Sequence, residues 1–187
     1  MSAYTLIYQS EQRRVIAMGD LPTSETLALR WTEVIRDPTL QDLPYKIELN
    51  ARGKIELSPA SNLHGCLQAR LAAELARQLP SGSPLTGCSI LTQIGIRVPE
   101  VAWASDAFLR AHGTSTPFPT APELCVEITS PSSSDDEIRE KIHAYLTAGA
   151  KEIWIVGEDG NIGYHDRDGE KASSSFNINV SLPDLSR

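Results

Sequence analysis

The sequence predicts an α/β or α+β fold in which a mixed β-sheet is flanked by helices on both faces. Three observations support this prediction: long segments with helical spacing of apolar residues, hairpins of alternating residues, and one short strand that is apolar on both faces. The elements follow one another as helix, hairpin, helix, strands, strand, helix and hairpin. Because each of them must bury an apolar face, this order favours layers of helix and sheet around one core. The order of the strands is left open.

The composition is that of one globular domain. The chain has 187 residues, of which 41% are hydrophobic and 22% charged. A chain of this length can bury about 70% of the surface that it exposes when unfolded. The composition excludes the collagenous, disordered and disulfide-stapled classes. We expect residues 1–42 to form an N-terminal helical or extended segment that packs on a main domain of residues 43–187.

The distribution of charge limits the partners and the compartment. No stretch approaches the roughly 18 consecutive apolar residues of a membrane span. Polar residues also interrupt the N-terminal segment too often for a signal peptide. We therefore expect a cytoplasmic protein with no membrane partner. The net charge of −7 predicts no general attraction to nucleic-acid phosphates, so any contact with DNA must rest on a local site.

Three cysteines lie far apart in the sequence without the C-x-x-C spacing of many metal and redox sites. They are Cys66, Cys88 and Cys125. Because each stands among apolar residues, we expect all three to be small buried hydrophobic side chains.

The first predicted elements are a short apolar opening, a helix and a hairpin. The opening is Tyr4–Tyr8, and the helix is Thr23–Arg36, where apolar residues recur at helical spacing until Pro38 ends the pattern. The hairpin consists of Tyr45–Asn50 and Lys54–Ser58, which alternate with a period of two on either side of a short turn.

The longest predicted helix is Ser61–Leu79, where leucines at every fourth position form one apolar stripe. The stretch Pro80–Pro84 is rich in proline, serine and glycine and ends this helix. Two strands are predicted next, at Cys88–Gln93 and Ile96–Ala104. A polar loop, His112–Ala121, follows them.

The last part of the chain contains the predicted central strand. This strand is Leu124–Thr129, which is apolar on both faces apart from one carboxylate. The hydroxyl of Ser134 can cap a helix that runs to Ala148, by accepting a hydrogen bond from the amide of Glu137. The remaining predicted strands are Lys151–Val156, Asn161–His165 and a last one near Ser175–Val180.

Two acidic residues lie inside apolar segments, where an unpaired carboxylate is costly to bury. Glu127 stands between Val126 and Ile128 on the predicted central strand, and Glu100 shares one face of the strand before it with the apolar residues two positions away on either side. Two acids on neighbouring strands can share a divalent cation such as Mg²⁺, which prefers oxygen ligands. The alternatives are a salt bridge or an edge strand for Glu127 and a solvated strand end for Glu100.

Three further polar residues stand near these acids in the predicted fold. Lys141 lies within or beside the apolar stripe of its helix, 14 positions after Glu127, and either meets Glu127 or an anion or extends outward to solvent. Glu48 repeats the interrupted pattern on the hairpin, as a third acid or as a solvent-facing residue. His64 lies in the first turn of the long helix, where it either contacts phosphate or metal or has a capping or surface role.

Several segments together resemble the Uma family of endonucleases, a branch of the PD-(D/E)XK restriction-endonuclease-like superfamily. They extend in family order from Leu43 to about Glu170, over about two-thirds of the chain. The matching segments are Leu43–Glu48, Ile55–Pro59 with His64 following, Val98–Ser105, Ala121–Ser132 and Lys141–Val156.

The resemblance implies a restriction-endonuclease-like mixed sheet flanked by helices, and a divalent-metal site that hydrolyses the phosphodiester bonds of DNA. Glu100 takes the position of the family's first acid, which is usually Asp, and Glu127 takes that of the second. Lys141 matches a catalytic lysine that has moved to the following helix, because Thr129 stands at the usual position. Glu48 matches the acid of the N-terminal hairpin.

The resemblance also implies how these residues work. One or two Mg²⁺ or Mn²⁺ ions and Lys141 would activate a water for attack on the phosphodiester. Glu48 would complete the acid cluster as an outer-sphere ligand, and His64 would bind the phosphate of the substrate or support the site as a scaffold. The implied metal ligands are Glu100, Glu127 and the backbone carbonyl of Ile128.

One departure from the family pattern opens a second interpretation. The extra methylene of Glu100 predicts slow, Mn²⁺-preferring or absent catalysis, because Mg²⁺ demands near-ideal octahedral geometry. The alternative is therefore a catalytically weak or inactive binding or regulatory module with the same fold. The serines at Ser130–Ser134 do not indicate a serine hydrolase, because the sequence has no G-x-S-x-G motif. A homodimer that concentrates the few basic residues, or a partner that delivers DNA, would offset the acidic charge.

Overall fold

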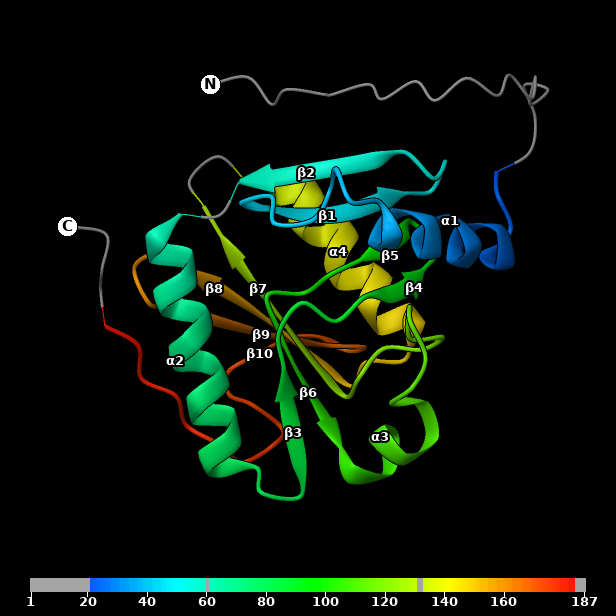
Figure 1. Ribbon diagram of the computed structural model, residues 1–187. Coiled ribbons are helices and arrows are strands. Elements are labelled where there is room, and N and C mark those ends of the chain that lie inside the picture. The colour runs from blue at the N-terminus through cyan, green and yellow to red at the C-terminus, as the bar shows by residue number, and fades with distance from the viewer. Residues whose placement is uncertain (1–20, 60, 131–132, 184–187) are drawn as a thin grey trace.

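The computed structural model describes residues 21–59, 61–130 and 133–183. In these ranges the chain forms four helices and ten strands, arranged as two β-sheets (Figure 1). The helices are α1 (Ser24–Arg36), α2 (Asn62–Gln78), α3 (Asp106–His112) and α4 (Asp135–Ala148). The strands are β1 (Tyr45–Asn50), β2 (Ile55–Pro59), β3 (Gly82–Leu85), β4 (Ile90–Thr92), β5 (Gly95–Arg97), β6 (Val101–Ser105), β7 (Leu124–Thr129), β8 (Glu152–Gly157), β9 (Ile162–Asp166) and β10 (Gly169–Lys171). None of the described helices is long and apolar enough to cross a membrane.

Each helix begins directly after a serine or threonine. The hydroxyls of Thr23, Ser61, Ser105 and Ser134 accept a hydrogen bond from the amide three residues further on. Because the first amides of a helix have no partner within it, such caps fix where the helix begins. The three predicted helices are confirmed, with ends that differ by at most one residue. The predicted opening Tyr4–Tyr8 lies outside the described residues.

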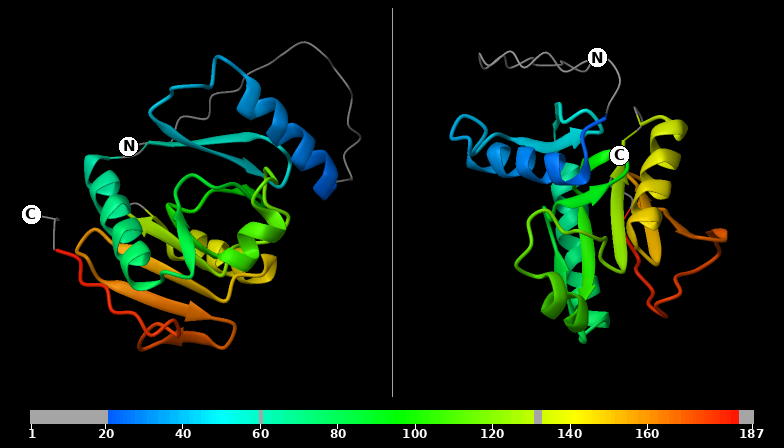
Figure 2. Two further views of the ribbon diagram at one scale, coloured as in Figure 1. Left: turned by 60° about the horizontal axis from the view of Figure 1, so that its bottom comes forward. Right: turned by 90° about the vertical axis from the view of Figure 1, so that its right-hand side faces the viewer.

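The larger sheet has the strand order β10-β9-β8-β7-β6-β3. Its strands β7 and β8 are parallel, and its other neighbours are antiparallel. Val126 of β7 packs with Leu71 of α2 on one face, whereas Cys125 packs with Tyr145 of α4 on the other. Figure 2 shows these two helices on either side of the sheet. The predicted mixed sheet with helices on both faces is therefore confirmed.

The smaller sheet has the strand order β2-β1-β5-β4 and lies across one end of the larger sheet (Figure 1). Its residues Leu49 and Ile96 pack with Leu27, Trp31 and Val34 of α1. The predicted N-terminal helix thus packs on the smaller sheet. The boundary between residues 42 and 43 stays a prediction.

Residues 96–104 do not form the single strand that their alternation predicted. β5 ends at Arg97 and belongs to the smaller sheet, whereas β6 begins at Val101 in the larger one. The residues between them cross from one sheet to the other, and Pro99 among them has no backbone N–H to donate to a strand. The expectation that Glu100 lies on a strand face is therefore wrong, because Glu100 stands directly before β6.

Three short elements, β3, α3 and β10, lie outside the predicted ones. β3 falls within the stretch predicted to be only a break after the long helix. It forms the edge of the larger sheet, where Pro84 is tolerated because an edge strand can leave one amide position unpaired. The strand predicted at Cys88–Gln93 is shorter than expected, because β4 spans Ile90–Thr92 alone.

Two other expectations are wrong. Ser175–Val180 forms no strand but packs beside α2, where the side-chain amide of Gln78 donates to the carbonyl of Asn179 and accepts from its amide, at 2.9 and 3.1 Å. The second expectation concerns the cysteines, because Cys66 is exposed and Cys88 is half-buried. Cys125 alone is buried as expected.

Candidate active site

The two acids that interrupt apolar segments meet at one end of the strands β6 and β7 in the larger sheet. β6 and β7 are antiparallel, and Val101 lies opposite Val126. The residue before Val101 is Glu100 and the residue after Val126 is Glu127, so the register places both acids at the same end of the strand pair. Both carboxylates are largely shielded from solvent, with side-chain exposures of 14% and 5%.

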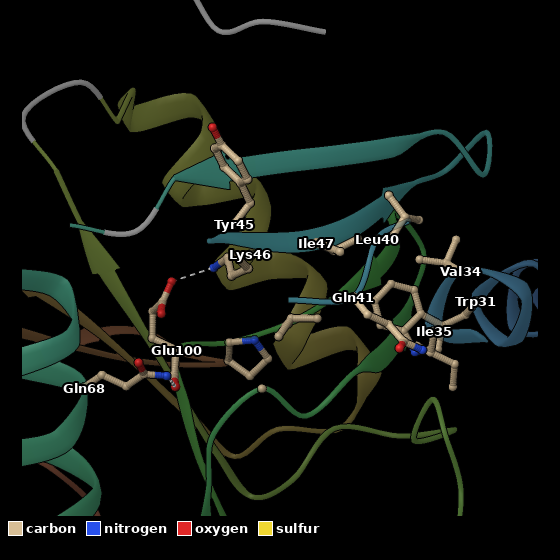
Figure 3. A pocket seen from close by; sticks show the side chains of 13 residues that line it. Trp31, Val34, Ile35, Leu40, Gln41, Tyr45, Lys46, Ile47, Gln68 and Glu100 are labelled. Carbon is tan, nitrogen blue, oxygen red and sulfur yellow. Dashed lines mark hydrogen bonds and ion pairs between the residues drawn. The ribbon is translucent and has the colours of Figure 1, made fainter. Parts of the chain in front are cut away.

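Lys46 joins the two acids. Its Nζ lies 2.9 Å from Oε1 of Glu100 and 3.2 Å from Oε2 of Glu127 (Figure 3 shows the first contact). Lys46 comes from the start of β1, so this contact connects the smaller sheet with the larger one. Both carboxylates thus share a single ammonium group.

α4 supplies two further groups to Glu127. Nζ of Lys141 lies 3.3 Å from Oε2 of Glu127, and the hydroxyl of Tyr145 donates a hydrogen bond of 2.6 Å to Oε1. Residues four apart share one face of a helix, so Lys141 and Tyr145 approach the strand together. Each oxygen of the buried carboxylate therefore has a partner. The alternative that Lys141 extends away into solvent does not hold.

Glu48 is buried behind this cluster and is not a solvent-facing hairpin residue. Its Oε1 accepts a hydrogen bond of 2.7 Å from the amide of Val98, and its Oε2 lies 3.2 Å from Nη1 of Arg97. The same Oε2 lies 4.0 Å from Nζ of Lys141. Arg97 is thus the main partner of Glu48, which borders the acid pair rather than joining it.

His64 lies at the beginning of α2 and lines the cleft into which Glu100 and Glu127 face. Its Nδ1 is 3.0 Å from Oγ of Ser61 and 3.9 Å from Oε1 of Glu158. Among the described residues, no hydrogen bond or ion pair connects His64 with Glu100 or Glu127. The structure therefore places it on the wall of the cleft, apart from the acid pair.

The cleft in front of the acids has a volume of about 490 Å³. Glutamates outnumber lysines on its walls, which makes it attractive to cations. Its charged and polar lining includes Lys46, His64, Glu100, Glu127, Glu137, Lys141 and Glu158. Ile128, whose backbone carbonyl is the third expected ligand, also borders it.

The pairing shifts the pKa values of the buried groups. Burial by itself raises the pKa of Glu127, but the ammonium groups of Lys46 and Lys141 and the hydroxyl of Tyr145 outweigh burial and lower this pKa to about 2. Burial lowers the pKa of Lys46, but Glu127 and two further glutamates raise it above its usual range. Burial and then Glu127 raise the pKa of Tyr145. At neutral pH, Glu127 is ionised, Lys46 is charged and Tyr145 is neutral.

The donor set fits a hard divalent cation in part. Carboxylate and carbonyl oxygens are the ligands that Mg²⁺ and Mn²⁺ prefer, and one or two carboxylates with waters are a usual protein contribution to a Mg²⁺ site. Glu100 and Glu127 are close enough to share the ammonium of Lys46 and hence to share a cation. In the described ranges, however, no group of three or more His, Cys, Asp or Glu residues is arranged to hold a metal.

Lys46 and Tyr145 belong to this cluster, although neither interrupts an apolar segment. The sequence does contain a signal for each. Lys46 shares one face of β1 with Glu48 because strand side chains alternate, and Tyr145 follows Lys141 by four residues on a helix. Both therefore lie one period of their element away from a residue that the sequence singles out, Glu48 on the strand and Lys141 on the helix.

Comparison with known proteins gives a family. Residues 37–178 match the Uma2 family, whose description is "Putative restriction endonuclease". A similar solved structure comes from Anabaena variabilis ATCC 29413 and is described as "a putative nuclease belonging to DUF820". The similarity covers 74% of this chain and 88% of that chain, with a TM-score of 0.56 and 18% sequence identity, so it shows a shared fold. A search of curated proteins found no match.

The family match spans both sheets, α2 and α4, and includes each residue of the acid and lysine cluster. It also agrees with the resemblance that the sequence segments indicate. The chain therefore belongs to the Uma2 family.

Proposed function

We propose that this protein is a divalent-metal-dependent endonuclease that hydrolyses phosphodiester bonds of DNA. The observation that supports the proposal most is the meeting of Glu100, Glu127 and Lys141 in one cleft, although they come from three separate segments of the chain. A carboxylate pair beside a lysine is an arrangement suited to binding a cation and a phosphate together. Membership of a family described as "Putative restriction endonuclease" agrees with this chemistry.

Glu100, Glu127 and the backbone carbonyl of Ile128 would hold Mg²⁺ or Mn²⁺ in this proposal. A divalent cation in such a site supplies Lewis-acid polarisation of the phosphate and a water of lowered pKa. The ammonium of Lys46 now lies between the two carboxylates, so it must move aside when a cation takes its place.

The protein's own groups have separate tasks. Lys141 would stabilise the negative charge that develops on the phosphate, because its ammonium already faces the cleft beside Glu127. Tyr145 is a positioning residue, since its hydrogen bond orients the carboxylate of Glu127. Glu48 would also be a positioning residue, because its carboxylate lies near the ammonium of Lys141. His64 would contact the phosphate from the wall of the cleft.

Nicking of a supercoiled plasmid in Mg²⁺ or Mn²⁺ tests the proposal. We expect the wild type to nick, and Glu127→Gln and Lys141→Met each to lower the rate by about a hundredfold or more. Exposed residues outside the cleft supply matched controls, Glu33→Gln and Lys54→Met, which should keep the wild-type rate. Absence of nicking by the wild type in both metals, or nicking that survives Glu127→Gln, contradicts the proposal.

A second function is favoured by one observation. Lys46 neutralises the acid pair, as expected for a module that keeps the fold without binding metal. Titration calorimetry with Mn²⁺ separates the two functions. Binding that disappears in Glu127→Ala supports the nuclease, whereas a wild type that binds no Mn²⁺ supports the inactive binding or regulatory module.

The proposal includes a homodimer, which places two clefts on one particle. Light scattering of the purified protein measures its mass in solution. A mass of twice 20.4 kDa is expected, and a mass of 20.4 kDa contradicts this part of the proposal.

A further inference from the structure

A second cavity adjoins the candidate active site. It has a volume of about 520 Å³ and is bordered by α1, β1, α2 and the connection between β5 and β6 (Figure 3). Lys46 and Glu100 border this cavity as well as the cleft, so the ion pair between them forms a wall common to both. We call this second cavity the side pocket.

The side pocket has apolar walls and polar ends. Trp31, Ile35 and Pro99 contribute apolar surface, and Figure 3 shows Trp31 and Ile35 at the end away from Glu100. At the near end, the amide of Gln68 donates a hydrogen bond of 2.7 Å to the carbonyl of Glu100. At the far end, the exposed side chain of Gln41 makes no hydrogen bond within the part of the chain that the structure describes. A flat, uncharged group with hydrogen-bonding edges suits such a pocket.

The charge of the molecule favours a base as that group. A net charge of −7 gives little affinity for the backbone of DNA, and Lys46 and Lys141, which face the cleft, are already paired with carboxylates. Affinity must then come from contacts that do not depend on phosphate charge. Stacking and burial of a base against apolar and aromatic side chains provide such contacts, and glutamine amides can bond to base edges.

We propose that the side pocket binds one unpaired nucleobase of the DNA strand whose phosphate lies in the adjoining cleft. This inference rests on the proposed function, because it takes the phosphate site from it. A base inside a duplex must be unpaired and unstacked before it can enter, whereas a base in a single strand is already available. The protein therefore prefers single-stranded or locally unpaired DNA to a matched duplex.

Binding of a short fluorescent oligonucleotide, measured by anisotropy, tests this inference. The single strand and its matched duplex are titrated in EDTA and in Ca²⁺, with a gel to show that the DNA stays uncut. We expect the wild type to bind the single strand about tenfold more tightly than the duplex. In Ile35→Trp, the larger side chain fills the pocket and lowers single-strand affinity about tenfold.

Leu29→Trp is the matched control. Leu29 lies on the same helix as Ile35, is 63% exposed and does not border the side pocket. The Leu29→Trp protein should bind the single strand with the affinity of the wild type. Circular dichroism melting of both variants shows whether the fold is intact, and Gln41→Trp, at another exposed position of the pocket, repeats the test should Ile35→Trp fail to fold.

Each outcome tests base binding in the side pocket independently of whether the protein hydrolyses DNA. Equal affinity for single strand and duplex, or equal affinity of Ile35→Trp and Leu29→Trp, overturns the inference even if the wild type nicks plasmid. A loss of binding in Ile35→Trp alone supports it even if no metal gives cleavage. If light scattering shows instead that Ile35→Trp changes the mass in solution, the pocket is a contact between copies of the chain and the inference is overturned.

Discussion

Lys46 determines how the acid pair behaves in the absence of metal. Its ammonium contacts both Glu100 and Glu127, and the ammonium of Lys141 contacts the same oxygen of Glu127, Oε2. The charges of these four groups sum to zero. A divalent cation entering the site must therefore compete with a cation that the protein supplies itself.

Replacing Lys46 should strengthen metal binding. In Lys46→Met the two carboxylates lose their shared ammonium, and a charge pair at this range is worth on the order of 4 kcal/mol near a protein surface. Part of this energy is offset by metal hydration and by loss of fold stability, so we expect the Kd for Mn²⁺ to fall about tenfold or more. Titration calorimetry measures it.

Lys54→Met is the control, because Lys54 lies on the same hairpin but is exposed at its turn. It should leave the Kd for Mn²⁺ unchanged. A Lys46→Met protein that is folded and binds Mn²⁺ no better than the wild type would show that Lys46 does not compete for the metal position.

The depressed pKa of Glu127 predicts how stability depends on pH. A group whose pKa falls from 4.5 unfolded to about 2 folded contributes stability that is complete above pH 4.5 and is lost as the pH falls toward 2. This contribution is on the order of 3 kcal/mol. We expect Glu127→Gln to be less stable at neutral pH and to lose less stability than the wild type in this window.

Urea unfolding followed by circular dichroism across this pH range measures both effects. Glu33→Gln serves as the control, because the carboxylate of Glu33 is exposed and pairs with Arg30 on the helix surface. If the unfolding free energies of the wild type and Glu127→Gln differ by the same amount from neutral pH down to pH 2, Glu127 is not the group that titrates.

Both acids and Lys141 could be predicted from sequence, but the contact of Lys46 with the acids could not. Glu100, Glu127 and Lys141 draw attention because a charge interrupts an apolar pattern. Lys46 interrupts nothing, since β1 begins at an exposed residue and its first positions alternate as an ordinary hairpin does. Its importance arises from the approach of the smaller sheet to the larger one, which no local pattern contains.

At the scale of elements, the three longer helices were predictable from the sequence, whereas α3 and several strand boundaries were not. Serine caps, leucine spacing and Gly149 each mark a helix end within a few residues. The segment from Ile96 to Ala104 reads as one alternating strand, yet it serves two sheets because the chain turns at Pro99. Alternation persists across such a turn, since both halves are buried, so periodicity alone cannot locate it.

The smaller sheet depends on one close approach of backbones. Gly95 has a φ of 121°, and a Cβ at this position would overlap the carbonyl oxygen of Leu49 on the paired strand. We expect Gly95→Ala to cost about 1–3 kcal/mol of unfolding free energy, because the backbone must give way. Thermal and urea unfolding measure the loss.

Gly65→Ala is the matched comparison within the same protein. Gly65 lies in α2, and a Cβ there would have no neighbour within 4 Å. Alanine should stabilise this helix by about 0.5–1 kcal/mol, because glycine has more conformational freedom to lose on folding. Equal effects of the two substitutions would contradict the assigned role of the Gly95 conformation.

At the scale of the whole molecule, the cleft forms where the two sheets meet. Lys46, His64, Glu100, Glu127 and Lys141 come from five separate segments, and each lies at or near the end of its helix or strand except Lys141. The layered architecture follows from the sequence pattern, whereas the crossing of a second sheet does not. The site is therefore a property of tertiary packing, and its residues could be named from sequence before their geometry could.

The acidic charge of the whole molecule predicts weak dependence of DNA binding on salt. The lysines that border the cleft are Lys46 and Lys141, so a bound single strand has at most about two phosphate contacts and the slope of log K against log salt is no steeper than about −1.4. Anisotropy titrations over a series of NaCl concentrations give this slope. A slope of about −4 or steeper would require six or more phosphate contacts. Such a result would place the binding surface outside the cleft and its side pocket, on basic residues brought together elsewhere on the molecule.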